Sequence, residues 1–486
     1  MSDTNTVFAI TCPLKNFSDG SVRSRLHMRN ALFSDTSHAP LHGIERPLLQ
    51  AGRHAFSHGR HAGLCMDRPA ASGDIGDRRL AFIGAFPIFQ KVHMHHAQAR
   101  HTPPQRRRFI QLAGGGAVLA ALPLAACSTG YPAASVSAWQ PPGETPDVRH
   151  WMLAHGLLAP NPHNRQPWIA DLRRDGEITL VCDGERLLPE TDPFGRQILI
   201  GCGAFIELAV MAAAERGHSV RVQLFPDGEP GPRELPGGRT VARLSLTRDA
   251  ATPKDPLFAQ IRRRHTHRGA FDNARVVPAD VWRGMTASAT DRSLLAGAVV
   301  SPVTMASLRS LTRDAFEAEM TTPRTYLESA RLMRIGPVEI ERHRDGIALM
   351  GTMVRVLAAS RLFDRFEVPA RGGAGYKQTM AHWSAAETGS GYLWIASRGN
   401  APAAQVNSGR AYVRAHLQAT AAGVDMQPLS QALQEFAEVR PQHDALRALL
   451  GFGNDDITLQ MLARVGYGMV GADAAPRREL GQLMRT

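Results

Sequence analysis

The chain has 486 residues, of which 43% are hydrophobic and 21% charged, and these shares are ordinary for globular proteins. Its formal net charge is +12, but 8 of these excess positive charges lie in residues 1–108. Because the part that can fold is only weakly basic, composition argues against a nucleic-acid-binding surface.

Residues 1–105 show neither helical nor strand periodicity, and 10 of the chain's 20 histidines lie in residues 1–101. These histidines are scattered and do not follow the spacing of metal ligands. We expect this leader to be disordered or to lie upstream of the true start, for which Met94 is a suitable initiator.

The segment 106–127 has the pattern of an export signal. Three arginines from Arg106 to Arg108 precede an apolar run of about fifteen residues, which ends in small residues before Cys127 and is short for a membrane span. The segment resembles a twin-arginine translocation signal with a lipoprotein box, and Cys127 is then the residue to be lipidated. An uncleaved membrane anchor is the alternative. We expect export to the periplasm or cell envelope in a folded state, which is typical of proteins that load a cofactor first.

The rest of the chain is expected to be an α+β protein made of two related halves. After a Pro-rich tether at 128–147, the first half (148–247) has a helix pattern at 148–158, strands at 177–182, 219–224 and 240–246, and a long helix at 196–216. The second half (248–486) has helices at 256–264 and 408–422, a strand at 392–397 and an irregular middle around 369–391. An insertion at about 322–389 could fold as a lid. No segment after residue 130 is predicted to span a membrane.

Two helices support the idea of related halves. Gly203 and Gly217 bound one, and Gly409 and Gly423 bound the other with the same spacing. So short a shared pattern can also arise by chance.

The first group of candidate site residues lies in the segment 159–168, where two prolines hold an extended loop. Asn161, His163, Asn164 and Gln166 offer donors and acceptors that suit the mixed edge of a flavin or another heteroaromatic ring. The alternative is a loop that only caps a helix or makes a turn.

The second group is Arg264, Thr266 and Arg268, within a run of arginines and histidines at 263–268. Guanidinium groups and a hydroxyl are the donors expected around a phosphate. A solvated basic run is one alternative. A metal site at His265 and His267 is another, although no further ligands lie nearby in the sequence.

These two segments resemble the nitroreductase-like superfamily of FMN-binding proteins. Ala-Pro-x-x-x-Asn-x-Gln-Pro-Trp at 159–168 is similar to the loop after the first helix of nitroreductases, and Arg-x-Thr-x-Arg at 264–268 is similar to their Arg-x-Ser-x-Arg phosphate motif. The order of the segments, with further matches at 187–196, 201–204, 344–347, 464–468 and 476–478, is most similar to Acg-type FMN-binding oxidoreductases. The resemblance covers about residues 147–481.

The resemblance implies a nitroreductase-like fold, in which a pseudo-dimer has mixed sheets flanked by helices, and it assigns roles to individual residues. Arg264, Thr266 and Arg268 would hold the FMN phosphate and ribityl chain, with Arg477 or Arg478 completing the anion site. Asn161, His163 and Asn164 would approach the isoalloxazine ring, and Gln166 is a further candidate. Backbone N–H groups around Ser430 and Gln431 would face the flavin, although nitroreductases usually have Glu-Gly there. No metal and no catalytic side chain are implied.

The phosphate motif occurs only in the second half and the Asn-rich loop only in the first, so we expect a monomer that resembles a dimer and holds one FMN. The resemblance implies electron transfer from NAD(P)H or another donor to a nitroaromatic or quinone-like acceptor. The competing hypothesis is a flavin-binding or sequestering protein with little or no turnover. No nucleic-acid partner is expected, and the membrane would be contacted only through the signal or a lipid anchor.

Overall fold

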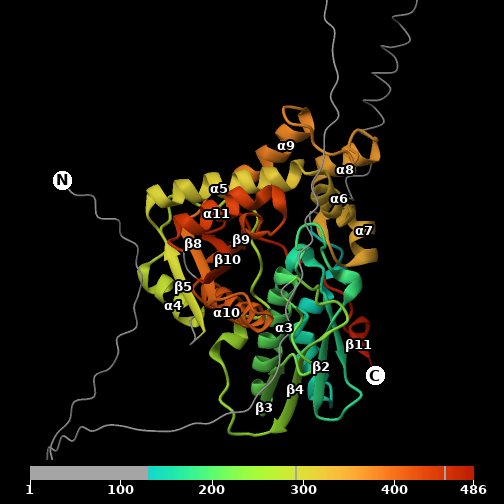
Figure 1. The fold of residues 1–486 in the computed structure, drawn as a ribbon. Helices are drawn as coiled ribbons and strands as arrows, with labels where there is room; N and C mark the ends of the chain where they lie inside the picture. The colour runs from blue at the N-terminus through green and yellow to red at the C-terminus, as the bar shows by residue number, and fades with distance from the viewer. Residues whose placement is uncertain (1–129, 232, 290–292, 454–455, 486) are drawn as a thin grey trace, which may run out of the picture. The chain divides into compact units, whose positions relative to one another are not determined.

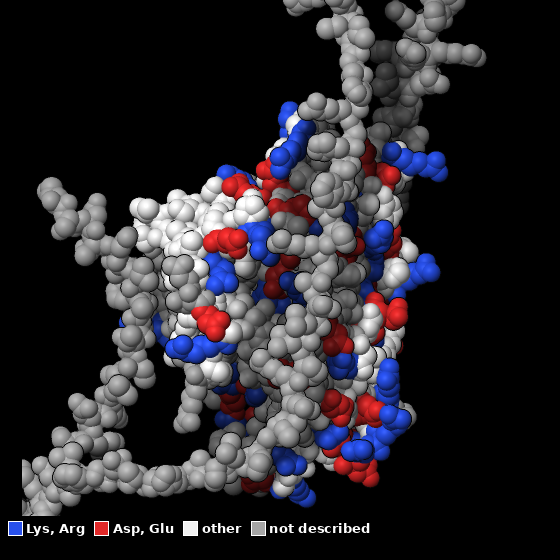
Figure 2. Space-filling model, viewed as in Figure 1, with Lys and Arg blue, Asp and Glu red and all other residues white. Residues whose placement is uncertain are grey.

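The computed structural model describes residues 130–231, 233–289, 293–453 and 456–485. The leader and the export signal with Cys127 lie outside these described residues. The described part has two main sheets with helices between and around them (Figure 1), which confirms the expected α+β class. In Figure 2, positive and negative side chains are interspersed over the visible described surface, consistent with its weakly basic sequence.

The first sheet has the strand order β11-β1-β2-β4-β3 and belongs mainly to the first half. All neighbours are antiparallel except β1 and β11, so the sheet is mixed and incorporates the C-terminal end of the chain. Alternate residues of β2 are buried, as expected for a strand with one face on the core. The strands are β1 (Trp168–Asp171), β2 (Glu177–Cys182), β3 (His218–Leu224), β4 (Thr240–Arg248) and β11 (Met484–Arg485).

The second sheet, β5-β8-β10-β9, is antiparallel throughout. Its strand β10 was absent from the predicted elements, although Ile457, Leu459, Met461, Ala463 and Val465 alternate along it. A register shift between Leu459 and Met461 changes which face these residues occupy. Met461 and Val465 join one core cluster and Leu459 and Leu462 another, so both faces of β10 are covered. The strands are β5 (Leu294–Val299), β8 (Gly391–Arg398), β9 (Asp425–Pro428) and β10 (Ile457–Gly466).

Helices α3 (Arg196–Glu215) and α10 (Pro402–Ala421) pack against each other at the centre of the structure (Figure 1). A Cβ on Gly203 would lie 1.9 Å from the carbonyl oxygen of Val406, and one on Gly409 would lie 1.9 Å from that of Ile200. The two contacts are reciprocal, since each glycine lies three residues after the carbonyl that the other helix approaches. Only glycine permits so close a crossing at both positions.

Contrary to the sequence prediction, α3 is long and apolar enough to cross a membrane by length and composition alone. In the structure 83% of the most apolar 18-residue stretch of this helix is buried, as in the core helix of a folded domain. Both cysteines of the described part, Cys182 and Cys202, are also buried as free thiols.

The remaining helices surround these sheets. The predicted helix at 256–264 is only a 3₁₀ turn, η5 (Pro256–Gln260), which begins at the side-chain cap from Asp255 and ends before the arginine run. The α-helices are α2 (Val148–Gly156), α4 (Ala279–Ala289), α5 (Pro302–Thr321) and α11 (Arg440–Leu449). Other 3₁₀ turns are η3 (Pro162–Asn164), η4 (Gly184–Arg186), η6 (Ser384–Glu387), η7 (Gln431–Leu433), η8 (Ala437–Val439) and η9 (Leu480–Gln482).

The insertion at 322–389 is largely helical. It contains α6 (Pro323–Arg331), β6 (Met333–Ile335), α7 (Gly336–His343), β7 (Ile347–Leu349), α8 (Thr352–Ala359) and α9 (Ala374–Trp383). The parallel pair β6–β7 forms a separate small sheet, and α9 occupies part of the stretch predicted to be irregular.

Part of the segment expected to be a tether is folded. Residues Ala133–Trp139 form the 3₁₀ helix η2, in which Ser135 and Trp139 are buried. The Ser135 carbonyl accepts a hydrogen bond from the Arg477 N–H at 2.9 Å, and the Trp139 indole donates to the carbonyl of Ala475 at 2.8 Å. This segment therefore packs on the C-terminal tail, beside several predicted site residues.

Candidate functional site

The predicted ring-binding loop has a strained backbone. His163, Asn164 and Gln166 have φ values of 46°, 50° and 51°, in the left-handed region that residues other than glycine seldom adopt. The Asn161 side chain stabilises the turn, because its Oδ1 accepts the Gln166 N–H at 2.7 Å. Strain held by the surrounding structure is a feature that often marks functional sites.

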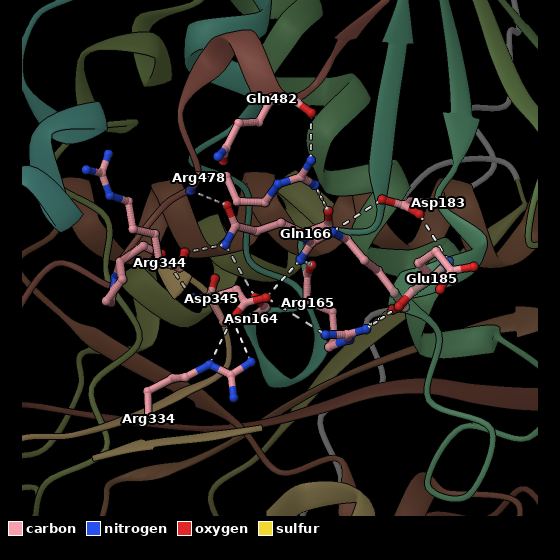
Figure 3. Close-up of polar contacts among 12 residues, drawn as sticks. Asn164, Arg165, Gln166, Asp183, Glu185, Arg334, Arg344, Asp345, Arg478 and Gln482 are labelled. Atoms are coloured by element: carbon pink, nitrogen blue, oxygen red, sulfur yellow. Dashed lines mark hydrogen bonds and ion pairs between the residues drawn. The ribbon is translucent and has the colours of Figure 1, made fainter. Parts of the chain in front are cut away.

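Gln166 and Asn164 fasten the loop to the insertion and to the C-terminal tail. The Gln166 amide donates to the carbonyl of Arg344 at 2.9 Å and accepts from the Arg478 N–H at 2.8 Å (Figure 3). The Asn164 amide donates to the carbonyl of Pro476 at 2.9 Å and accepts from Arg477 Nη1 at 2.5 Å. In this structure these two amides shape the loop, since their side-chain groups are already engaged with protein.

Asp345 anchors the same region from the insertion. Its carboxylate binds Arg186 Nη1 and Arg334 Nη2, each at 2.9 Å, and lies 3.9 Å from Arg165 Nη1 (Figure 3). The next residue, Gly346, donates its N–H to the carbonyl of Asn164 at 3.3 Å. The insertion thus holds the loop of the first half through direct polar contacts.

Arg264 and Arg477 meet at the C-terminal end of α2. Both donate to the carbonyl oxygen of Leu158, at 2.9 and 3.2 Å, where a cation is favoured by the helix dipole. The side chains are 2% and 4% exposed, and burial lowers the pKa of Arg264 to about 10 and that of Arg477 to about 9. Trp139 lies against both guanidinium groups.

These two arginines are not fully satisfied. The Nε atoms of Arg264 and Arg477 are buried without a hydrogen-bond partner, and neither side chain forms an ion pair with a described carboxylate. A buried, unpaired guanidinium group is costly, so this arrangement favours an anionic ligand. Arg478 is different because its Nη atoms donate to the carbonyls of Gln166 and Gln482, which makes it a cross-link of the loop.

Arg268 has the most available guanidinium group of the predicted anchors. Its side chain is exposed and makes no hydrogen bond or ion pair with any residue that the structure describes. Its charge acts on two neighbours, since it lowers the pKa of His163 and opposes the increase that burial causes in the pKa of Tyr131. A residue of the second half is therefore close to the loop of the first half.

The segment with Thr266 runs alongside β9. Thr266 forms a parallel bridge with Met426, and the His267 N–H donates to the Met426 carbonyl at 3.2 Å. The chain then continues from β9 to Ser430 and Gln431, at the start of η7. Within the described part of the chain, the N–H groups of Ser430 and Gln431 have no recorded acceptor, so both remain available as donors.

The histidines of the 263–268 segment are engaged elsewhere. His265 Nε2 lies 3.1 Å from Asp425 Oδ1, and His267 Nε2 lies 2.7 Å from the carbonyl oxygen of Val470. Among residues 130–485, as far as these are described, no group of three or more potential metal ligands occurs. The metal alternative thus has no ligand set in this region.

Glu319 is a candidate functional residue that the sequence interpretation missed. It is 2% exposed at the end of α5 and lies beside His163 and Gln431, two predicted site residues from opposite halves. A sequence signal existed, because Glu319 occupies a position on the apolar helical face. The buried positions of that face are Met305, Leu308, Thr312, Ala315 and Glu319.

No protein-family model matches the chain. A Mycobacterium tuberculosis H37Rv protein, named “Putative NAD(P)H nitroreductase Rv3131”, is 28% identical over 350 residues, covering 68% of this chain and 90% of the relative. A second protein from the same strain, “Putative NAD(P)H nitroreductase acg”, is 39% identical over 85 residues, which are 17% of this chain and 25% of that relative.

Solved structures that overlap with the chain include an FMN-dependent nitroreductase, NfnB, from Mycobacterium smegmatis in complex with NADPH. It is 20% identical, with 47% of this chain and 97% of that chain covered at a TM-score of 0.32. A nitroreductase with bound FMN from Bacteroides fragilis is 13% identical, with coverages of 46% and 95% and a TM-score of 0.27.

The sequence match to the mycobacterial relative spans 350 residues and therefore does not depend on a single motif. The chain is thus similar over most of its length to a protein named as a nitroreductase, and this similarity supports the nitroreductase-like superfamily expected from its motifs.

Proposed function

We propose that the protein is an FMN-dependent oxidoreductase of nitroreductase type. In this proposal it passes electrons from NAD(P)H to a nitroaromatic or quinone-like acceptor. The observation that carries it is the meeting of the two halves, where the free guanidinium group of Arg268 lies close to the strained loop at His163. The names of the sequence relatives point to the same reaction class.

The residues present fit a phosphate monoester. Arg264, Arg268 and Arg477 carry three positive charges without an ion-pair partner in the described region, and two buried Nε donors are free. Arg264 and Arg477 already donate to the Leu158 carbonyl, which supports a smaller share of the phosphate contacts for them than the resemblance implies. We assign the main phosphate contact to Arg268, with the two buried arginines contributing charge and their free Nε groups.

Bound FMN would supply two-electron redox chemistry, accepting a hydride from NAD(P)H and returning it to the acceptor. This chain's own residues would hold and tune it. Asn161 and His163 come from the first half, and the free N–H groups of Ser430 and Gln431 come from the second. Donors fixed beside a developing negative charge stabilise it without reorganising.

The proposal includes one site per chain, in a monomer that resembles a dimer. The reciprocal approach of Gly203 and Gly409 supports two related halves, since each helix contributes the same contact to the other. It also includes export by the twin-arginine pathway, with lipidation at Cys127, on the basis of the sequence pattern at 106–127. Replacing Arg106 and Arg107 with Lys should retain the folded precursor in the cytoplasm, and unchanged export would contradict this part.

Stopped-flow mixing of the FMN-loaded protein with NADPH tests the reaction. We expect the flavin absorbance to bleach within seconds and to return when menadione is added. A flavin that stays oxidised for minutes, together with menadione that is not reduced, would refute the reductase and favour a flavin-holding protein.

A further inference from the structure

Three side chains form a continuous hydrogen-bonded path behind the predicted ring-binding loop. Ser329 Oγ, in α6, lies 3.3 Å from Glu319 Oε1 and 3.0 Å from His163 Nε2. Glu319 and Ser329 are each 2% exposed, whereas the His163 side chain is 15% exposed. The path therefore leads from a buried carboxyl group to a residue that solvent or a ligand can reach.

The contacts around Glu319 define a direction for this path. Gln434 Nε2 donates to Glu319 Oε2 at 3.1 Å, so a proton on this carboxyl group is favoured on Oε1, which faces Ser329. Ser329 Oγ donates to Glu319 Oε1 when Glu319 is ionised. When Glu319 is protonated, the same contact can run in the opposite direction, and the Ser329 hydroxyl is then free to donate to His163 Nε2. In this arrangement the proton of the neutral imidazole is on Nδ1, for which no protein partner is recorded among the described residues.

Burial favours the neutral form of both end groups of the path, and neighbouring charges add to this effect. Burial raises the pKa of Glu319 to about 7, the Glu328 carboxylate of α6 acts in the same direction, and hydrogen bonds from Gln434, Ser329 and Gln431 oppose it. Burial lowers the pKa of His163 to about 4, and the positive charges of Arg268 and Arg165 add to this effect. At pH 6 a protonated carboxyl group thus faces an unprotonated imidazole.

We propose that Glu319, Ser329 and His163 are a proton relay that supplies the electron acceptor with its proton. The inference rests on the proposed function, because it needs an acceptor at the flavin site. A quinone that receives one hydride and one proton becomes a hydroquinone, and the hydride derives from NAD(P)H by way of the flavin. His163 gives its Nδ1 proton to the acceptor oxygen, Nε2 takes the Ser329 proton, and Ser329 takes the Glu319 proton. Glu319 becomes a carboxylate, and water reloads the relay from the open side of His163.

The same three residue types occur in hydrolases, but the geometry here does not suit a nucleophile. Ser329 lies in the middle of the path, buried between its two partners. A nucleophilic serine must be at the open end of such an array, next to the substrate. Here His163 has that position.

The tautomer of His163 tests the relay in the protein itself, without turnover. Nitrogen-15 NMR of the histidine-labelled, folded protein, with the signal assigned by loss in His163→Gln, should show the neutral Nδ1–H form at pH 6. The Nε2–H form, or an imidazolium at pH 6, would overturn the proposal because the path could not then run toward the site.

Transient kinetics test the transfer. The flavin is reduced with dithionite and reoxidised with menadione, so the experiment does not depend on NADPH as donor. Ser329→Ala and Glu319→Gln should each slow reoxidation about 100-fold, the order of magnitude for loss of general acid catalysis, and should abolish its solvent deuterium isotope effect. Glu319→Asp, which restores a carboxyl group, should recover part of the rate and the isotope effect.

Thr325→Val is the matched control. Thr325 donates to the backbone carbonyl of Glu319 and lies in the same helix pair, but it is outside the proton path. This variant should reoxidise at the wild-type rate. Equal rates in wild type, Ser329→Ala and Glu319→Gln would overturn the relay even if the protein is an active reductase. Failure to bind FMN would instead refute the proposed function, while the His163 tautomer would still test the path.

Discussion

Adding one methyl group at Gly409 should destabilise the protein, although alanine is the better helix former. A Cβ at this position would lie 1.9 Å from the carbonyl oxygen of Ile200 and 2.7 Å from its carbon, whereas real Cβ atoms stay beyond 3.0 Å. Both close atoms belong to the backbone of α3, so a side-chain rotation cannot relieve the clash. The two helices must separate by about 1 Å, which weakens dispersion contacts along their interface.

The magnitude follows from two opposing contributions. Overpacking of this kind costs about 3 kcal/mol at the upper end of the usual range. The higher helix propensity of alanine offsets less than about 1 kcal/mol of this cost. We therefore expect Gly409→Ala to lower the free energy of unfolding by about 2 kcal/mol or more. Gly203→Ala should behave alike, and the double variant should lose less than the sum, because one separation relieves both clashes.

Urea denaturation followed by circular dichroism measures the change. Gly375→Ala is the control, since a Cβ on this α9 glycine meets nothing within 4 Å. It should leave stability unchanged or raise it by up to about 1 kcal/mol. If Gly409→Ala is as stable as the wild type, the close crossing of α3 and α10 is refuted.

Two further predictions concern the site. The protonated form of Glu319 is favoured by folding, since its pKa is raised from 4.5 to about 7, so this contribution to stability is full below pH 4.5 and is lost as the pH rises through 7. The free energy of unfolding of Glu319→Gln should therefore rise relative to that of the wild type as the pH increases, by up to about 3 kcal/mol at pH 8.5. An equal difference between the two proteins in urea titrations at pH 5 and pH 8.5 would contradict this. Arg268→Ala should weaken FMN binding about 10- to 100-fold, as expected for one lost hydrogen bond to a charged group. Arg263 is an exposed neighbour, and Arg263→Ala should not change the FMN affinity. Equal FMN affinities of both variants in fluorescence titrations would show that Arg268 is misassigned.

The elements with clear periodicity were predictable from the sequence. Strand β2 occupies the predicted range 177–182, and α3 ends within one residue of its predicted end at 216. Strand β10 was missed although its apolar residues alternate. The sequence could not reveal the register shift between Leu459 and Met461, which places these two residues in different core clusters. The helix α10 begins at Pro402, six residues before its predicted start, since Pro402 takes the first helical position, where its missing N–H is harmless.

The candidate site was predictable as a set of segments but less so in its details. In the structure the loop at 161–166 contacts Arg477 and Arg478 directly, whereas the role of these residues in binding FMN stays a prediction. The sequence could not reveal that Arg264 and Arg477 donate to a carbonyl at the end of α2. It also could not reveal that the Gln166 side chain bonds to the backbone of Arg344 and Arg478. In each case the partners are more than 100 residues apart. A single buried glutamate such as Glu319 is visible only as a polar residue on an apolar helical face.

We propose that one chain forms one complete FMN site from its two halves. The most direct measurement is the stoichiometry of FMN, from the flavin absorbance and protein concentration of the folded, FMN-saturated protein, with the molecular mass determined by sedimentation. We predict one FMN per chain in a monomer. Absence of bound flavin after incubation with FMN, or binding only in a dimer that holds two flavins, would contradict the account.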